Sequence, residues 1–228
     1  MNAVVYYSGS GQTKKVAEKI AESLNFICLD LLETNQKEFN RLVLAFPIYC
    51  QNCPKIVKTF LNLVKCNSLA LIATYGRMGC GNAFWEIQRD FSFNVIAGAY
   101  IPTAHSYLIG DKEFDDFSSL CNLQEKILNG NGQVLFSKLF KNPFANFFKD
   151  TRSRFNLKII KNNNCILCGE CNKKCPYKAI NKGKTNKKCI RCLKCVSSCK
   201  QNALTFKKGL MLNLYLKKKK QNKLIIYI

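Results

Sequence analysis

Two cysteine runs constrain the fold of this chain more than any other feature. They are CILCGECNKKCP at 165–176 and CIRCLKCVSSCK at 189–200, and both have the spacing Cys-x2-Cys-x2-Cys-x3-Cys. Each cysteine of the first run recurs 24 residues later, and Ala179-Ile180 after the first run is matched by Ala203-Leu204 after the second. Similarity at a fixed offset indicates one small structural unit that has been duplicated. The sequence therefore predicts a small fold that is internally duplicated.

The thiol spacing within each run bears on the kind of metal site. A four-cysteine zinc site uses two separated pairs, whereas three closely spaced thiolates plus a more distant fourth suit a cubane iron–sulfur cluster. The runs resemble those of bacterial ferredoxins, which implies a small α+β domain that holds two [4Fe-4S] clusters. One departure is Lys200, which stands where the first run has Pro176. The resemblance implies that the fourth cysteine of each run binds the other cluster, giving the sets Cys165, Cys168, Cys171, Cys199 and Cys189, Cys192, Cys195, Cys175.

The distribution of charge divides the chain into two parts. Residues 1–134 hold 12 basic and 12 acidic side chains, whereas 135–228 hold 24 basic and 2 acidic ones. A chain of 228 residues is long enough for two domains. We expect a first domain at 1–134, a Phe-rich basic linker at 135–158, the two-cluster domain at 159–208 and a basic tail at 209–228.

The first domain opens with a strand, a polar loop and a helix. VVYY at 4–7 is followed by SGSGQT at 8–13 and by apolar residues at helical spacing. A helix N-terminus has unpaired N–H groups and a partial positive charge, so it favours a bound phosphate. The loop has neither Walker nor dinucleotide spacing, and a tight turn with a capping Thr is the structural alternative. The phosphate-binding candidates are Ser8, Gly9, Ser10, Gly11, Gln12 and Thr13.

Strands and helices alternate along the rest of this domain. The pattern predicts strands near 2–7, 26–30, 41–47, 68–75 and 94–101, and helices near 12–24, 54–65, 81–91 and 113–129. Such an order predicts a parallel sheet with helices on both faces and ligand loops at the carboxyl ends of the strands.

The opening segment resembles the FMN-phosphate signature of flavodoxins. The matching residues are Val4, Val5, Tyr6, Ser8, Gly11, Thr13, Ala17 and Ile20. The resemblance implies a five-stranded, doubly wound parallel sheet of order 2-1-3-4-5 and bound FMN. It also places isoalloxazine contacts in the loops after the third and fourth strands, at Pro47, Ile48, Tyr49, Thr74, Tyr75 and Gly76. Tyr49 and Tyr75 are the aromatic candidates for covering the flavin, and partly buried strand-end tyrosines are the alternative.

The whole chain is similar to flavodoxin–ferredoxin fusion proteins of anaerobic bacteria. That resemblance implies an electron-transfer protein that passes single electrons between two [4Fe-4S] clusters and FMN, with no catalytic side chain assigned. Two alternatives stay open. One is an FMN-dependent oxidoreductase that acts on a quinone- or porphyrinogen-like substrate, and the other is a cluster-containing protein that binds nucleic acid or anionic lipid.

Location and partners follow from the leader pattern and the charge. Met1 leads directly into a strand, without the charged and apolar regions of a secretory leader, so we expect a cytoplasmic protein with reduced thiols. The basic part favours an acidic redox partner, and we expect no nucleic acid. No apolar run is long enough for a membrane span. We expect segment 136–155 to pack between the domains and segment 217–220 to be a solvated charge run, and contact with a membrane surface is the alternative for both.

The remaining reactive side chains are expected to be structural. CQNC at 50–53 has dithiol spacing, but a chance pair is common in a chain with 14 cysteines. His105 is the one histidine of the chain, and we expect it in a loop or in the core. Small apolar roles are expected for Cys28, Cys66, Cys80 and Cys121.

Overall fold

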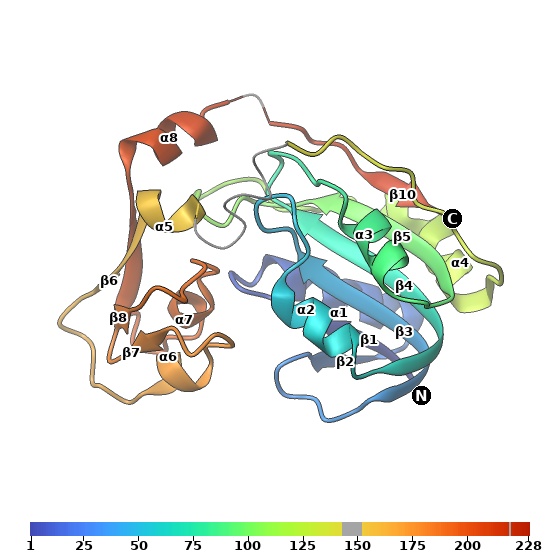
Figure 1. Cartoon of the computed structure of the whole chain (residues 1–228), viewed down its shortest axis with the longest axis horizontal. Helices are drawn as coiled ribbons and strands as arrows, with labels where there is room; N and C mark the ends of the chain where they lie inside the picture. The colour runs from blue at the N-terminus through green and yellow to red at the C-terminus, as the bar shows by residue number, and fades with distance from the viewer. Residues whose placement is uncertain (143–151, 219) are drawn as a thin grey trace.

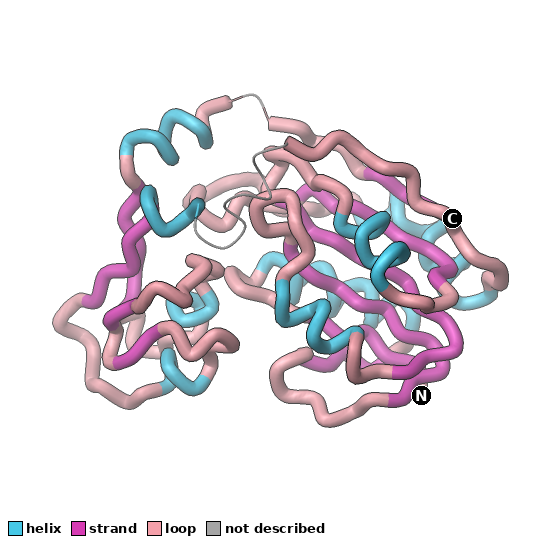
Figure 2. Tube along the Cα trace, in the orientation of Figure 1, coloured by secondary structure: helices cyan, strands magenta, loops and turns pink. Residues whose placement is uncertain are grey.

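A computed structural model of the chain describes residues 1–142, 152–218 and 220–228. Figure 1 shows two lobes. We call residues 1–142 together with 220–228 the flavodoxin-like lobe, and residues 152–218 the cysteine lobe. Figure 2 shows a large sheet flanked by helices in the first, and short helices and strands joined by loops in the second.

The flavodoxin-like lobe alternates strands and helices as the sequence predicts. Its parallel strands are β1 (Asn2–Tyr6), β2 (Ile27–Asp30), β3 (Glu38–Pro47), β4 (Lys65–Tyr75) and β5 (Val95–Pro102). Its helices are α1 (Gln12–Leu24), α2 (Lys55–Leu61), α3 (Ala83–Asp90) and α4 (Cys121–Asn129), with the 3-10 turn η1 (Phe117–Leu120) before α4. The parallel strands have the order β2-β1-β3-β4-β5. The expected doubly wound, flavodoxin-like fold is confirmed.

The helices cover both faces of this sheet because the strand side chains alternate. Val5 of β1 packs into one core with Val57 of α2 and Ile87 of α3. Val4, its neighbour in β1, packs into the opposite core with Ile20 of α1. Burial at this spacing fixes each helix against one face. The carboxyl ends of the parallel strands then lie together at one edge, where the candidate ligand loops begin.

The C-terminal segment adds a sixth strand to the sheet, which the sequence analysis places in a tail. β10 (Ile225–Tyr227) pairs antiparallel with β5, and in Figure 1 it lies beside β5. The segment before it is also held, because Lys220 pairs with Asp111 and the Gln221 N–H donates to the Arg77 carbonyl. The expected five-stranded sheet is thus completed by a strand that returns from the far end of the chain.

The predicted linker does not form one unit. Phe136 is buried against Phe84 and Tyr227 in the flavodoxin-like lobe, and Leu157 already begins a strand of the cysteine lobe. Residues 143–151, which include three of the linker phenylalanines, lie outside the described residues. Among the helices in the described ranges, none is both long and apolar enough to cross a membrane.

The cysteine lobe is built from short elements. They are α5 (Arg152–Asn156), β6 (Leu157–Lys161), α6 (Glu170–Lys173), β7 (Ile180–Asn181), β8 (Lys184–Thr185), α7 (Lys194–Ser197), β9 (Leu204–Lys208) and α8 (Leu210–Leu216). β6 pairs antiparallel with β9, and β7 pairs antiparallel with β8. In sequence, the β7–β8 hairpin therefore lies between the two paired strands β6 and β9.

The backbone repeats the duplication that the cysteine spacing predicts. Left-handed φ values recur 24 residues apart, at 56° and 60° for Leu167 and Arg191 and at 47° and 48° for Lys178 and Asn202. Because non-glycine residues seldom adopt positive φ, a matched pattern of this kind indicates two copies of one loop structure. α6 and α7 occupy equivalent places in the two copies.

Candidate functional site

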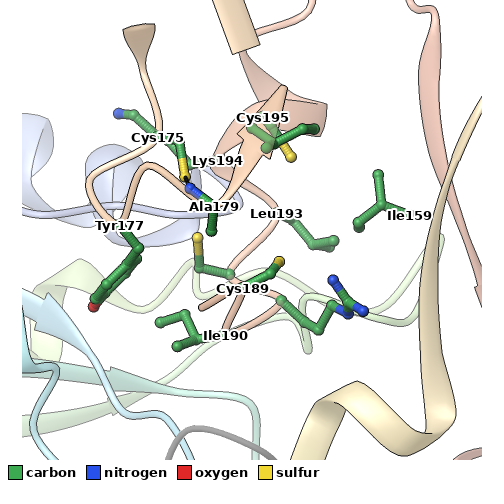
Figure 3. Close-up of a pocket in the computed structure, with 12 residues that line it drawn as sticks. Ile159, Cys175, Tyr177, Ala179, Cys189, Ile190, Leu193, Lys194 and Cys195 are labelled. Atoms are coloured by element: carbon green, nitrogen blue, oxygen red, sulfur yellow. Dashed lines mark hydrogen bonds between the residues drawn. The ribbon is translucent and has the colours of Figure 1, made fainter. Parts of the chain in front are cut away.

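Four of the predicted cluster cysteines line one cavity. Cys175 follows α6, Cys189 and Cys192 precede α7, and Cys195 lies in α7, and all four border the same space. Figure 3 labels three of them, Cys175, Cys189 and Cys195, around it. This is the set that the ferredoxin resemblance assigns to a single cluster, with one cysteine from the first run and three from the second.

The cysteines surround a space and do not converge on a point. In the part of the chain that the structure describes, no three Cys, His, Asp or Glu side chains are close enough to hold one metal ion. A cubane cluster holds its thiolates apart by the width of its core, so its ligands lie around a cavity. Four cysteines around one space is the arrangement that a cubane cluster with four thiolate ligands would need.

Backbone amides point at the sulfur atoms in a repeated manner. The Ala179 N–H donates to Cys175 Sγ at 3.3 Å, and the Ala203 N–H donates to Cys199 Sγ at 3.3 Å. Such bonds stabilise negative charge on sulfur and adjust the potential of a bound cluster. Burial, with Cys192 nearby, raises the pKa of the Cys195 thiol to about 12, so a cationic metal core is what would favour its thiolate.

The second predicted set is less enclosed. Cys171 and Cys199 pack against the small core formed by Ile180, Cys195 and Leu204. Cys165 is partly buried and Cys168 is exposed, in the loop before α6. Cys171 and Cys195 thus share one small core, although the two sets assign them to different clusters.

The candidate phosphate loop joins β1 to α1. Gly11 has a φ of +99°, and its N–H donates to Ser8 Oγ at 3.1 Å. A Cβ at Gly11 would meet no atom within 4 Å, so the space beside this backbone is open. Hydrogen bonds join Ser10 to Ser106 at 2.8 Å and Thr13 to Thr74 at 2.7 Å between their hydroxyl oxygens. These contacts bring the loop against the ends of β4 and β5.

The other predicted flavin residues fall into two groups. Pro47 ends β3 beside Thr74, and the Ile48 N–H donates to the Thr74 carbonyl at 2.8 Å, so these residues lie at the sheet edge beside the loop. Gly76 packs directly against the His105 ring. The Gln12 side-chain amide donates to the Glu113 carboxylate at 3.3 Å. The Gln12 amide is therefore directed to the loop before η1.

The two candidate tyrosines have different surroundings. The Tyr49 hydroxyl lies directly against Gly9 of the phosphate loop, and its ring meets the Tyr7 ring edge-on at 6.4 Å. Tyr75 is buried in the core, and its hydroxyl donates to the Lys223 carbonyl at 2.6 Å. Tyr75 therefore holds the C-terminal segment in place through its hydroxyl.

The two candidate sites touch one another. The Cys192 carbonyl lies directly against Gly9, and the Ser197 hydroxyl donates to the Gly9 carbonyl at 2.8 Å. A largely buried ion pair joins Lys194 Nζ to Asp30 Oδ2 at 3.1 Å. The loop that carries Cys192 is thus packed on the loop that is expected to bind phosphate.

Sequence reasoning missed several residues at this junction. Asp30 is the last residue of β2, and Tyr107 lies in the loop after β5. The Tyr107 hydroxyl donates to the Arg191 carbonyl at 2.9 Å. The sequence pattern assigns Tyr7 no role beyond the end of the first strand. The strand ends alone indicate that these positions border the site, but the partners lie more than 80 residues away in sequence.

The remaining reactive side chains have structural surroundings. Cys53 is buried, and burial raises the pKa of its thiol far above the ordinary range. Burial lowers the pKa of His105 to about 4, and its Nδ1 accepts from the Tyr107 N–H at 3.1 Å. The Cys53 thiol and the His105 ring are therefore both uncharged at neutral pH.

Comparisons with known proteins give limited matches. No family model matches the chain. Over 46 residues the chain is 50% identical to the uncharacterized protein MJ0750 of Methanocaldococcus jannaschii, a stretch that covers 20% of this chain and 19% of that protein. The chain thus spans about a fifth of the length of this relative.

Two solved structures are also similar. A candidate flavoprotein from Bacteroides uniformis has a TM-score of 0.41 at 18% identity, over 46% of this chain and 92% of that one. The Trp repressor binding protein from Bacillus subtilis has a TM-score of 0.34 at 16% identity, over 57% and 99%. Both likenesses are too distant to carry an argument about function.

Proposed function

We propose that this chain is an electron-transfer protein in which the cysteine lobe holds two [4Fe-4S] clusters and the flavodoxin-like lobe binds FMN. The observation that carries the proposal is the junction at Gly9. There the loop of a four-cysteine cavity packs directly on the candidate phosphate loop. When bound, such clusters exchange single electrons, and a flavin takes up one or two.

The chain's own residues support each cofactor differently. The cluster cysteines present thiols around a shared space and receive N–H donors from the backbone. At the phosphate loop, the N-terminus of α1 and the open side of Gly11 would receive the anion. Ser8 and Thr13 would add hydroxyl donors, and Tyr49 is the aromatic residue placed beside this loop.

An electron carrier is favoured over an enzyme that acts on a small substrate. The Cys192 carbonyl and the Tyr49 hydroxyl both lie against Gly9, so protein atoms cover this part of the loop. A substrate-reducing flavin enzyme needs an open space over the ring, whereas an electron relay needs its centres packed close together. The contact between lobes supports the second arrangement.

We also propose that the physiological partner is an acidic redox protein. The part of the chain after residue 134 has 24 basic and 2 acidic side chains, and such charge steers encounters with an acidic surface. Association with an acidic ferredoxin should then weaken as salt rises from 50 to 300 mM. An affinity that does not depend on salt would contradict this part of the proposal.

Cofactor counting tests the main proposal. We expect anaerobically prepared protein to hold about eight iron, eight sulfide and one FMN per chain, as the two cysteine runs and the phosphate loop imply. Cys175→Ala and Cys189→Ala should lose the same cluster, while Cys66→Ala, a matched change in β4, should lose none. Loss of different clusters in the two variants would contradict the ligand sets. Zinc in place of iron, or FAD in place of FMN, would contradict the cofactor assignment.

A further inference from the structure

A buried hydroxyl of the flavodoxin-like lobe faces a cysteine of the cysteine lobe. Tyr7 follows β1, has no solvent exposure, and its ring is part of the sheet core. Its hydroxyl is buried and has no hydrogen-bond partner of ordinary geometry in the described ranges. The Cys192 thiol and the Tyr49 hydroxyl both lie beside this hydroxyl.

An unpaired buried hydroxyl is costly for a fold, by about 1–3 kcal/mol. Phenylalanine would fill the same core volume without that cost. Of the two groups beside the hydroxyl, an ionised Cys192 sulfur is a stronger acceptor than the neutral Tyr49 hydroxyl. A nearby thiolate would supply the missing acceptor. The Tyr7 O–H can donate to Cys192 Sγ once that sulfur is ionised by a bound metal cluster.

The surrounding contacts fix the position of Cys192 relative to Tyr7. The Cys192 carbonyl rests on Gly9, two residues beyond Tyr7, and Ser197 of α7 donates to the Gly9 carbonyl. The Lys194–Asp30 ion pair holds the other side of the same loop. The donor is therefore positioned by the packing of one lobe on the other.

We propose that Tyr7 is a positioning residue whose hydroxyl donates to the Cys192 sulfur and raises the reduction potential of the cluster that Cys192 binds. The inference rests on the proposed function, because it needs the cluster. A hydrogen bond to a ligand sulfur stabilises the more negative, reduced state of the cluster, so its loss lowers the potential. The flavodoxin-like lobe thus sets the potential of a centre in its neighbour.

The test is a potentiometric titration of the holoprotein monitored by electron paramagnetic resonance. In Tyr7→Phe, we expect one cluster to become harder to reduce by about tenfold in its equilibrium constant, which is about 59 mV for one electron. The other cluster should keep its potential. Tyr100→Phe is the matched control, because Tyr100 is equally buried but its hydroxyl accepts from the Phe84 N–H at 3.0 Å.

The two variants should also differ in stability. Tyr7→Phe should leave unfolding of the apoprotein unchanged or make it harder, whereas Tyr100→Phe should destabilise it because the Phe84 N–H loses its acceptor. Unchanged potentials of both clusters in Tyr7→Phe would overturn the inference alone. A wild-type protein that assembles no cluster would overturn the proposed function together with it.

Discussion

A substitution at Gly9 can test whether the two lobes pack on one another. A Cβ added at this position would stand less than 3.0 Å from the Cys192 carbonyl oxygen and from the Tyr49 hydroxyl, where ordinary contacts are 3.4–4 Å. Because the first obstacle is backbone, it cannot rotate away. Gly9→Ala should therefore push the loop of Cys192 off the phosphate loop.

The size of the effect follows from the contacts that oppose separation. Forced overpacking costs about 1–3 kcal/mol. The Ser197–Gly9 and Tyr107–Arg191 hydrogen bonds contribute about 1 kcal/mol each, and the Lys194–Asp30 pair about 1.5–3 kcal/mol. The clash cancels a large share of the stabilisation that these three contacts provide. Separation of the Cys192 loop from the phosphate loop should therefore become about 10- to 100-fold more frequent.

Hydrogen–deuterium exchange measures this opening directly. In Gly9→Ala, amides of residues 190–198 should exchange at least about tenfold faster, while those of β3 and β4 keep their protection. Gly132→Ala is the control, because its φ of +91° brings strain but its Cβ would meet no atom within 4 Å. Unchanged exchange at 190–198 in Gly9→Ala would refute the packing of the two loops.

Three further predictions address single residues. Gly11→Val should abolish flavin binding and leave the clusters in place, because a φ of +99° strains a β-branched residue in the phosphate loop. Measured flavin and iron contents check this prediction, and retained flavin would contradict it. Tyr75→Phe removes the bond to the Lys223 carbonyl, so residues 220–228 should become more sensitive to protease, and unchanged cleavage would count against the role of Tyr75. For His105, burial lowers its pKa to about 4 against an unfolded value near 6.5. Folding stability should therefore fall by up to about 3 kcal/mol as pH drops from 6.5 toward 4. Urea unfolding of His105→Gln should lack this loss, and an identical pH profile would contradict it.

Much of the fold could be predicted from local sequence. The helix expected at 12–24 has the same bounds as α1, because its buried residues repeat at helical spacing. The cysteine runs likewise predicted the duplicated loops of α6 and α7. The sixth strand was not predicted, since residues 225–227 lie beside a lysine run and gain their place only by pairing with β5.

The site was predicted less completely than the fold. The cysteines and the phosphate loop carry spacing that reports their chemistry, so they could be identified one by one. Tyr7, Asp30 and Tyr107 carry no such spacing, because each acts through a partner in the other lobe. The bond from the Tyr75 hydroxyl to a segment nearly 150 residues away was also not predictable, because nothing in the local sequence marks that partner.

Stopped-flow reduction of the flavin under anaerobic conditions tests most directly whether the two lobes form one circuit. The variant in which Cys189, Cys192 and Cys195 are replaced by Ala should still bind FMN, because the phosphate loop belongs to the other lobe. With a low-potential donor that enters through the clusters, its flavin should be reduced at least about tenfold more slowly than in the wild-type protein. An equal rate in the two proteins, across several donors, would contradict an electron path from the clusters to the flavin.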